Sequence, residues 1–332
     1  MPVRHTSIFL HSGWRCGSTY MWSRFRQSPH AMCFYEPFHE TLARCTAKKI
    51  RRDTHSSWNS RHPILDQPYR QEYLPFIRLR GMPGYHDEFA VARYFPSADG
   101  IEPELKYLRR LLGQASRAGK SAVLGFSRSL ARSAAIKRAL GGYHIVVQRD
   151  PLQQWLSCRS YRVNEASVYF ELCHFLILAL ASPESPAGRF AQHLGLPRPP
   201  RGNLRKQYQF LQAAIHPWTD ELSYRAFLAV HALSHEIAHA TADLTVDMDR
   251  LNTDDGYRNK LRTTIFGRTG FTLSLDAGHG GKHDVNQVSF DVVAVERDTL
   301  RVLRQCQSSG AGNPDPEDEG EFEGLVARQP TT

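Results

Sequence analysis

The sequence predicts an α/β protein with a mainly parallel sheet covered by helices. The main observation is that apolar runs of strand length alternate with segments in which apolar residues recur at helical spacing. A second is the length of 332 residues, which is enough to bury a large core. A third is the longest apolar stretch, 169–181, which contains Glu171 and His174 and is shorter than the roughly 20 residues of a membrane-spanning helix. We therefore expect this stretch to be a core helix, and we expect no membrane span.

The elements can be assigned in chain order. The first strand is expected at 7–11, and a glycine-bearing loop and a helix follow it. Leucines at positions 105, 108, 111 and 112 predict a helix over 102–118, which Gly119 ends. The remaining expected elements are a strand at 121–126, a helix at 130–140, a strand at 143–148, mainly helices from 151 to about 242 with a proline-rich loop at 197–202, a weaker strand at 244–248 and a closing helix at 291–305.

The charge is unevenly distributed along the chain. The formal net charge is +9, yet the segment after Cys306 carries six acidic residues against Arg328 alone, which leaves the preceding part at about +14. A part of the chain with this much positive charge attracts anions, such as phosphorylated small molecules, nucleic acid or acidic surfaces. The segment 307–332 is rich in Gly, Pro, Asp and Glu and poor in apolar residues. We expect one domain over 1–306 and a disordered acidic tail over 307–332.

The N-terminus and the cysteines indicate a cytoplasmic location. Residues 1–5 lead directly into a short strand-like run, so no secretory signal is expected. The six cysteines, at positions 16, 33, 45, 158, 173 and 306, include no CxxC pair. This pattern favours free thiols in a reducing compartment.

The loop after the first strand has the composition of an anion-binding loop. Gly13 and Gly17 permit a tight turn, and the run Arg15-Cys16-Gly17-Ser18-Thr19 would present N–H groups, two hydroxyls and one positive charge at a helix N-terminus. The alternative is an ordinary capped turn. The GxxxxGKS spacing of nucleoside triphosphate sites is absent here. A near match at 113–121 has five residues between its glycines and sits after a helix and before a strand, the reverse of what such a site requires.

Three motifs together resemble one enzyme family. They are Trp14-Arg15-Cys16-Gly17-Ser18-Thr19 after the first strand, Tyr35-Glu36-Pro37 after the first helix, and Arg149 at a strand end with Ser157 eight residues later on the next helix. This order is similar to that of sulfotransferases that use 3′-phosphoadenosine 5′-phosphosulfate (PAPS). The Trp-Arg and Tyr-Glu-Pro sequences resemble those of the carbohydrate and protein-tyrosine branches more than those of the cytosolic branch. The resemblance implies a P-loop-like, three-layer α/β/α fold.

The resemblance also implies a set of site residues. Arg15, Cys16, Gly17, Ser18 and Thr19 would hold the 5′-phosphosulfate. Arg149 and Ser157 would hold the 3′-phosphate, and Asp150 and Pro151 also predict the start of the helix that carries Ser157. Glu36 would be the general base, Arg15 would stabilise the leaving oxygen, and no metal would be required.

Other residues are less well assigned by the motifs. His39 is a second candidate base, and Arg128 either contacts sulfate or acceptor or lies in solvent at a helix start. Lys282, in the glycine-rich stretch 278–283, is a candidate for a loop that closes the nucleotide site. The acceptor hydroxyl is open among carbohydrate, protein tyrosine, lipid and small metabolite, and its pocket is expected within 44–94 and 161–241.

Two other function classes compete with this interpretation. His235-Glu236-Ile237-Ala238-His239 is an HExxH sequence, which on a helix places two histidines on one face and a glutamate beside a zinc-bound water, as in zinc hydrolases. No third ligand is indicated by spacing. A nucleic-acid or polyanion-binding protein without chemistry is compatible with the basic charge, but no run of aromatic and basic residues supports it, and no nucleic-acid partner is expected.

Overall fold

The structure is a computed structural model that describes residues 6–54, 62, 65–97, 99–200, 202–215, 218–277 and 281–309. The chain divides into two compact units. The first is formed by the described residues within Met1–Arg149 and Glu236–Lys282, and the second by those within Asp150–His235 and His283–Thr332. Each unit is described by itself below.

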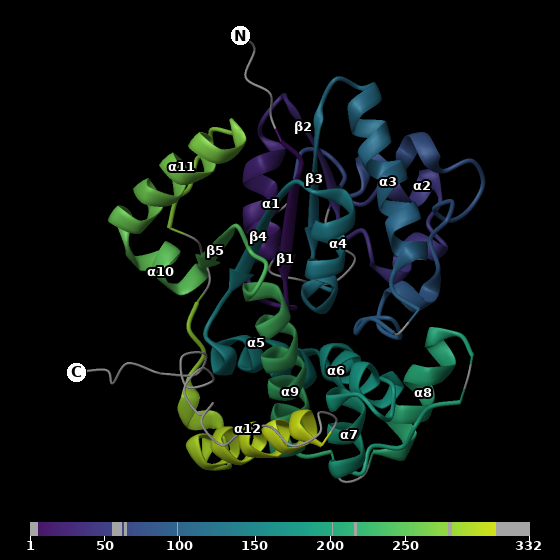
Figure 1. Cartoon of the computed structure of the whole chain (residues 1–332), viewed down its shortest axis with the longest axis vertical. Coiled ribbons are helices and arrows are strands. Elements are labelled where there is room, and N and C mark those ends of the chain that lie inside the picture. Colours follow the sequence, from purple (N-terminus) through teal and green to yellow (C-terminus); the bar gives the residue numbers. More distant parts are fainter. Residues whose placement is uncertain are drawn as a thin grey trace. The chain divides into compact units, whose positions relative to one another are not determined.

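The first unit holds a five-stranded, all-parallel sheet in the order β2-β3-β1-β4-β5. Its strands are β1 (Ile8–Ser12), β2 (Ala31–Tyr35), β3 (Ser121–Phe126), β4 (Tyr143–Gln148) and β5 (Leu244–Asp247). Its helices are α1 (Ser18–Arg26), α2 (Ala47–Arg51), α3 (Glu102–Arg117), α4 (Ser133–Leu140), α10 (Met248–Thr253) and α11 (Asp255–Thr269), with short 3₁₀ turns at Glu40–Ala43, Gln71–Phe76, Asp87–Phe89 and Leu130–Arg132. Figure 1 shows the strands between α11 and α3.

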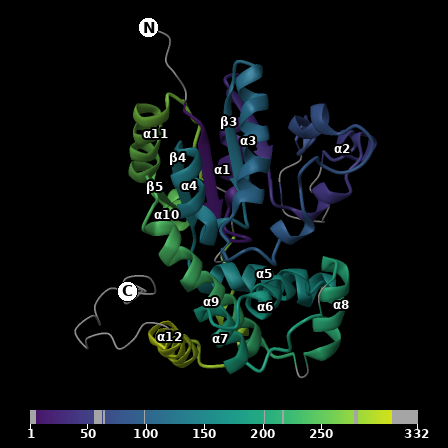
Figure 2. The same cartoon turned by 45° about the vertical axis from the view of Figure 1, so that its right-hand side comes forward.

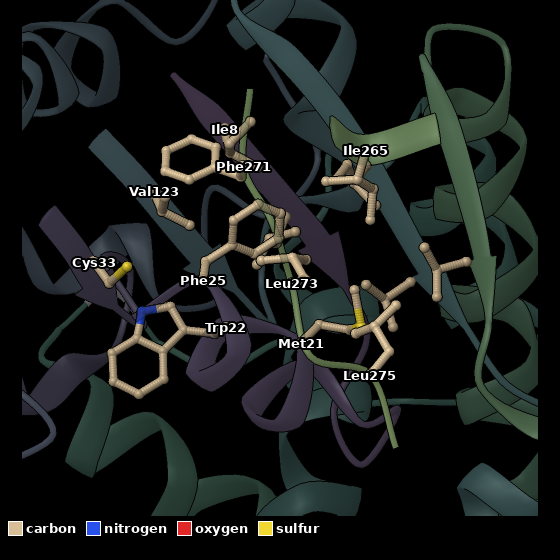
Figure 3. Close-up of a cluster of buried hydrophobic side chains, with 14 of the residues drawn as sticks. Ile8, Met21, Trp22, Phe25, Cys33, Val123, Ile265, Phe271, Leu273 and Leu275 are labelled. Atoms are coloured by element: carbon tan, nitrogen blue, oxygen red, sulfur yellow. The ribbon is translucent and has the colours of Figure 1, made fainter. Parts of the chain in front are cut away.

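Alternate side chains of the strands pack into two separate cores, because successive residues of a strand point to opposite faces of the sheet. Ile8 and Leu10 pack with α1 and α11, whereas Phe9 packs with α3 and α4. Figure 3 shows the first of these cores, in which Trp22 and Phe25 of α1 face the strands. In Figure 2, α2 lies on the same side of the sheet as α3, and its Ile50 joins the second core. The predicted three-layer α/β/α fold is confirmed, and all neighbouring strands are parallel.

The second unit is helical. It comprises α5 (Pro151–Glu165), α6 (Tyr169–Leu180), α7 (Pro186–His193), α8 (Leu204–Ala214), a 3₁₀ turn at Val285–Gln287 and α12 (Val292–Ser308), while α9 (Asp220–His239) passes from this unit into the first. α6 coincides with the long apolar stretch and is buried, with Phe175 and Leu176 fully enclosed. None of the described helices is long and apolar enough to cross a membrane.

Most of the expected elements are confirmed to within a few residues. The expected helix at 130–140 begins as a 3₁₀ turn and becomes α-helical only at Ser133. The closing helix continues to Ser308, past the start assigned to the acidic tail. The rest of that tail, 310–332, lies outside the described residues, so its disorder and the domain boundary at 306 stay predictions.

The contact between α1 and the sheet leaves no room for a side chain at position 125. A Cβ atom on Gly125 would lie 2.8 Å from Cδ1 of Trp22. Gly125→Ala should therefore lower the free energy of unfolding by about 1–3 kcal/mol, as overpacking of a filled core does. Gly113, inside α3, is a matched control, because an added Cβ there would meet only the Arg117 side chain at 3.6 Å. Gly113→Ala should be neutral or stabilise by up to about 1 kcal/mol. Urea unfolding measures both, and a Gly125→Ala protein as stable as the wild type would refute the packing described here.

Candidate functional site

The predicted site segments of the first unit leave the sheet at one edge. The loop 13–17 follows β1, Glu36 follows β2, Ser127 and Arg128 follow β3, and Arg149 follows β4. Because β2, β3, β1 and β4 are parallel neighbours, these segments meet at the carboxyl ends of the strands. The chain after β1 crosses to one side of the sheet and the chain after β3 to the other, and ligands of open α/β sheets bind at such a change of direction. We call this region the carboxyl edge.

The loop 13–17 leads into a helix start that is open to an anion. Gly17 is the N-cap of α1, at φ 88, and neither a side-chain cap nor an acidic residue in the first turn accompanies it. A Cβ on Gly17 would lie 2.8 Å from Cε of Met248, so glycine is required by both conformation and space. The first N–H groups of α1 therefore point out of the helix with no acidic side chain in its first turn, and such open helix starts bind anions.

Side chains of the loop fix its position on the sheet. The Cys16 thiol is fully buried and donates to the backbone oxygen of Val147 in β4, at 2.9 Å. Burial raises the pKa of this thiol, so it stays protonated. The Cys16 side chain thus anchors the loop, and only its backbone N–H is left for the predicted role in binding.

Ser18 and Thr19 are both buried in the first turn of α1. Oγ1 of Thr19 lies 3.2 Å from the Tyr35 hydroxyl and 3.4 Å from Nε2 of His62. Burial, with the charges of Arg15 and Arg70, lowers the pKa of His62 to about 3, so this imidazole is neutral. The end of β2 therefore touches the start of α1, and Glu36 is the next residue after that contact.

The Glu36 carboxylate is buried and held by three donors. Its Oε2 accepts from the Ser127 N–H at 3.1 Å, from the Ser127 hydroxyl at 2.8 Å and from Nη1 of Arg128 at 3.2 Å. The Glu36 N–H donates to the backbone oxygen of Gly125 at 2.8 Å. This arrangement connects the end of β2 to the end of β3 through one carboxylate.

Burial raises the pKa of Glu36, while Arg128 and the two bonds from Ser127 act in the opposite direction without cancelling it. A carboxylate with a raised pKa is a stronger base than an ordinary one, and this suits proton abstraction near neutral pH. His39, the second candidate base, is also buried. Its Nδ1 accepts from the Thr41 N–H at 3.1 Å, and burial lowers its pKa well below the usual value. His39 is therefore a neutral cap of the turn at Glu40–Ala43.

Two of the predicted site residues, Arg15 and Glu36, have strained backbone conformations. Among the described residues, positive φ angles outside glycine occur at Arg15 (62°), Glu36 (50°) and Ala166 (49°). Such conformations cost about 1–3 kcal/mol each and persist where the surrounding structure enforces them, often at functional sites. Both residues assigned a catalytic role from the sequence are in this set.

Arg128 is buried, so the alternative of a solvated arginine at a helix start is wrong. Besides Glu36, it binds Glu40 through Nη2 at 3.1 Å. The loop that carries it is fixed to β1, because the next residue, Ser129, bonds Nδ1 of the buried His11 at 2.7 Å. Arg128 thus neutralises the buried carboxylate that the sequence assigned as a base.

Arg149 points along the end of β4 toward two segments from late in the chain. Its Nη2 donates to the backbone oxygen of Gly281 at 3.1 Å, and its Nε lies 3.6 Å from Oδ1 of Asp249. Residues 278–280 of the candidate closing loop lie outside the described residues, and Lys282 at its end is exposed. The approach of Gly281 to Arg149 brings part of this loop to the carboxyl edge.

Ser157 lies on α5, which belongs to the second unit, so its convergence with Arg149 stays a prediction. Ser157 is buried. The predicted helix start is confirmed, since the Asp150 carboxylate accepts from the Gln153 N–H at 2.8 Å and Pro151 occupies the first helical position.

The HExxH stretch lies on α9. His235 is buried, Glu236 is exposed, and Nδ1 of His239 lies 3.3 Å from the Thr245 hydroxyl. Within the described ranges, no group of three or more His, Cys, Asp or Glu residues is arranged to hold a metal ion. A zinc hydrolase needs three protein ligands and an open position, so this alternative receives no support.

Sequence reasoning missed three residues near the site, namely His62, Arg70 and Asp249. Arg70 is buried, binds Asp53 through Nη1 at 2.7 Å and lies 5.5 Å from the centroid of the Tyr35 ring. None of the three belongs to a motif, and each reaches the carboxyl edge through a contact between segments distant in the sequence. An isolated sequence holds no signal for such contacts.

The raised pKa of Glu36 has a consequence for stability that does not depend on activity. Because the folded protein binds this proton more tightly than the unfolded chain, the free energy of unfolding should fall as pH rises from about 4.5 through the raised pKa. Glu36→Gln removes this contribution. The free energy of unfolding of the wild type should therefore fall relative to that of the variant between pH 4.5 and the raised pKa, and at higher pH the two curves should run parallel. Glu165→Gln, at an exposed glutamate, should follow the wild type. Curves of wild type and Glu36→Gln that stay parallel from pH 4 to 8 would contradict the raised pKa.

Comparison with solved structures gives a distant similarity. No protein-family model and no curated protein sequence matches the chain. A solved structure of a sulfotransferase from Alicyclobacillus acidocaldarius aligns over 91% of this chain and 96% of its own, at 13% sequence identity and a TM-score of 0.39. The chain is thus similar in structure, at a distance, to a bacterial sulfotransferase.

Proposed function

We propose that the protein is a cytoplasmic PAPS-dependent sulfotransferase that transfers the sulfuryl group to an acceptor hydroxyl. The observation that carries this proposal is the meeting, at one edge of the sheet, of an open helix N-terminus with a buried carboxylate of raised pKa. The first suits a sulfated phosphate and the second suits a hydroxyl proton. The six cysteines are buried free thiols, which is compatible with the proposed location.

The donor end of the site fits an anion of this kind. The N–H groups of residues 16–19 would hold the 5′-phosphosulfate, with the Ser18 and Thr19 hydroxyls as further donors and Arg15 as the fixed positive charge. Arg149 would bind the 3′-phosphate. Its present contacts with Gly281 and Asp249 keep the guanidinium at the carboxyl edge and leave donors of its planar fork for a phosphate. Ser157 completes the predicted set.

The chemistry is an in-line displacement at sulfur. A bond forms between the acceptor oxygen and sulfur, the bond from sulfur to the 5′-phosphate oxygen breaks, and 3′-phosphoadenosine 5′-phosphate leaves. The acceptor proton passes to the Glu36 carboxylate. Negative charge builds on the leaving phosphate oxygen, where Arg15 and the N–H groups of the loop stabilise it. As in phosphoryl transfer, positioning and electrostatics supply most of the rate, and no metal has a role in this proposal.

Ser127 and Arg128 keep Glu36 ready for this step. Because both occupy Oε2, its other oxygen, Oε1, is the one assigned to the acceptor hydroxyl. Arg128 also stabilises the charged form of Glu36, so the base is deprotonated over more of the neutral range than burial alone would allow.

Two substitutions should separate binding from chemistry. Glu36→Gln should retain affinity for 3′-phosphoadenosine 5′-phosphate and lose transfer by about 10²–10⁴-fold, the usual contribution of a general base. Arg149→Ala should weaken that affinity by about 10–100-fold, the effect of losing a hydrogen bond to a charged group. Calorimetric titration measures the affinity for 3′-phosphoadenosine 5′-phosphate. Transfer from labelled PAPS to a panel of carbohydrate, tyrosine, lipid and metabolite hydroxyls measures the rate of transfer.

Arg138→Ala is the matched control, since Arg138 is an exposed arginine of α4, outside the proposed site. It should change neither quantity. Normal turnover in Glu36→Gln would remove the base assignment, and unchanged affinity in Arg149→Ala would remove the 3′-phosphate assignment.

A further inference from the structure

A cavity of about 420 Å³ opens in the first unit, in the stretch that follows Glu36. Its wall is built from the turn that contains Thr41, from α2 and the residues after it, and from Arg70. This volume lies within the range of small-molecule sites in proteins. None of the three sequence motifs includes it.

The wall of the cavity is strongly basic above an apolar floor. Lys48, Lys49, Arg52 and Arg70 line it together with one carboxylate, Asp53, and the buried Cys45 and Ile50 lie among them. Arg70 is paired with Asp53 at 2.7 Å. Lys48, Lys49 and Arg52 are exposed, and none of them forms an ion pair with any other residue in the described part of the chain. Three cations are thus left to bind a ligand.

The cavity is connected to the proposed active site through Arg70 and Tyr35. The Arg70 guanidinium lines the cavity and lies 5.5 Å from the centroid of the Tyr35 ring. The Tyr35 hydroxyl lies 3.2 Å from Oγ1 of Thr19, in the first turn of α1. Tyr35 also precedes Glu36 directly. Arg70 and Tyr35 therefore lie between the cavity and the residues of the proposed active site, and the charge of Arg70 acts on Glu36.

We propose that this cavity is the acceptor subsite, and that it selects acceptors carrying a carboxylate, sulfate or phosphate group near the hydroxyl that is sulfated. Lys48, Lys49 and Arg52 bind the anionic group. The apolar floor accommodates the carbon skeleton of the acceptor, and the hydroxyl is directed toward Glu36. This inference rests on the proposed sulfotransferase function and adds the chemical class of its acceptor.

The test compares four matched sugars: glucose, glucuronate, glucose 6-phosphate and glucose 6-sulfate. They share the hydroxyls at carbons 1 to 4 and differ at carbon 6, so they test the effect of a negative charge there and distinguish the three anionic groups. Their binding to the full chain saturated with 3′-phosphoadenosine 5′-phosphate is measured by ligand-detected NMR, and their sulfation is measured with labelled PAPS. At least one anionic sugar should bind about tenfold more tightly than glucose, as expected for a charge-assisted hydrogen bond.

Substitutions on α2 and at its C-cap, Arg52, locate the effect. Lys49→Ala combined with Arg52→Ala should abolish the preference for the anionic sugar. Arg51→Ala removes one exposed cation from the same helix without touching the cavity wall, so it should keep the preference. Thermal unfolding of the three proteins confirms that each is folded. An equal loss in the Arg51→Ala protein would show a general charge effect and overturn the subsite.

The outcomes separate this inference from the proposed function. If 3′-phosphoadenosine 5′-phosphate binds but no anionic sugar is preferred over glucose, the acceptor class is wrong and the sulfotransferase proposal stands. If the nucleotide does not bind, the sulfotransferase proposal fails, and the acceptor role that rests on it fails with it. A preference for the anionic sugars that the double variant abolishes, in a protein that binds the nucleotide, supports the inference.

Discussion

The buried pair of Glu36 and Arg128 is the interaction on which the carboxyl edge depends. A carboxylate taken out of water is costly unless it is matched by charge and hydrogen bonds, and breaking such a pair from one side costs about 3–5 kcal/mol. Here the three donors to Glu36 come from two consecutive residues after β3. The pair therefore ties the ends of β2 and β3 together, and it holds Glu36 in a strained backbone conformation that the residue would not adopt alone.

Other contacts extend this connection across the sheet. The Ser12 hydroxyl bonds the Phe126 oxygen and the Cys16 thiol bonds the Val147 oxygen, so the loop after β1 is fixed to the strands on both of its sides. Under the loop, His11 bonds both Ser129 and His144, and burial keeps these two imidazoles neutral. The open start of α1 and the base are thus parts of one rigid framework, which is what a transfer reaction governed by positioning requires.

The sequence predicted the elements whose signal is local. β1, β3 and β4 are short apolar runs, α3 shows leucines at helical spacing, and α5 has its Asp-Pro start. The motifs at 14–19 and 35–37 and the assigned Arg149 also led to the carboxyl edge. The region 38–97 was not predicted, because its described residues form mostly short 3₁₀ turns packed by aromatic side chains. α10 and α11 carry too few regularly spaced apolar residues to stand out. Arg70 and the partners of Glu36 act across 17 to 92 residues of chain, beyond the reach of any local pattern.

The most direct measurement of the central claim is hydrogen exchange of the backbone amides with and without 3′-phosphoadenosine 5′-phosphate. If the start of α1 holds the 5′-phosphate, the amides of residues 15–19 should exchange more slowly in the complex, because a phosphate would bind N–H groups that the helix leaves open. Adenosine, which has no phosphate, should leave these amides unchanged. Nucleotide binding that protects other segments but not residues 15–19, or no binding at saturating nucleotide, would contradict the account.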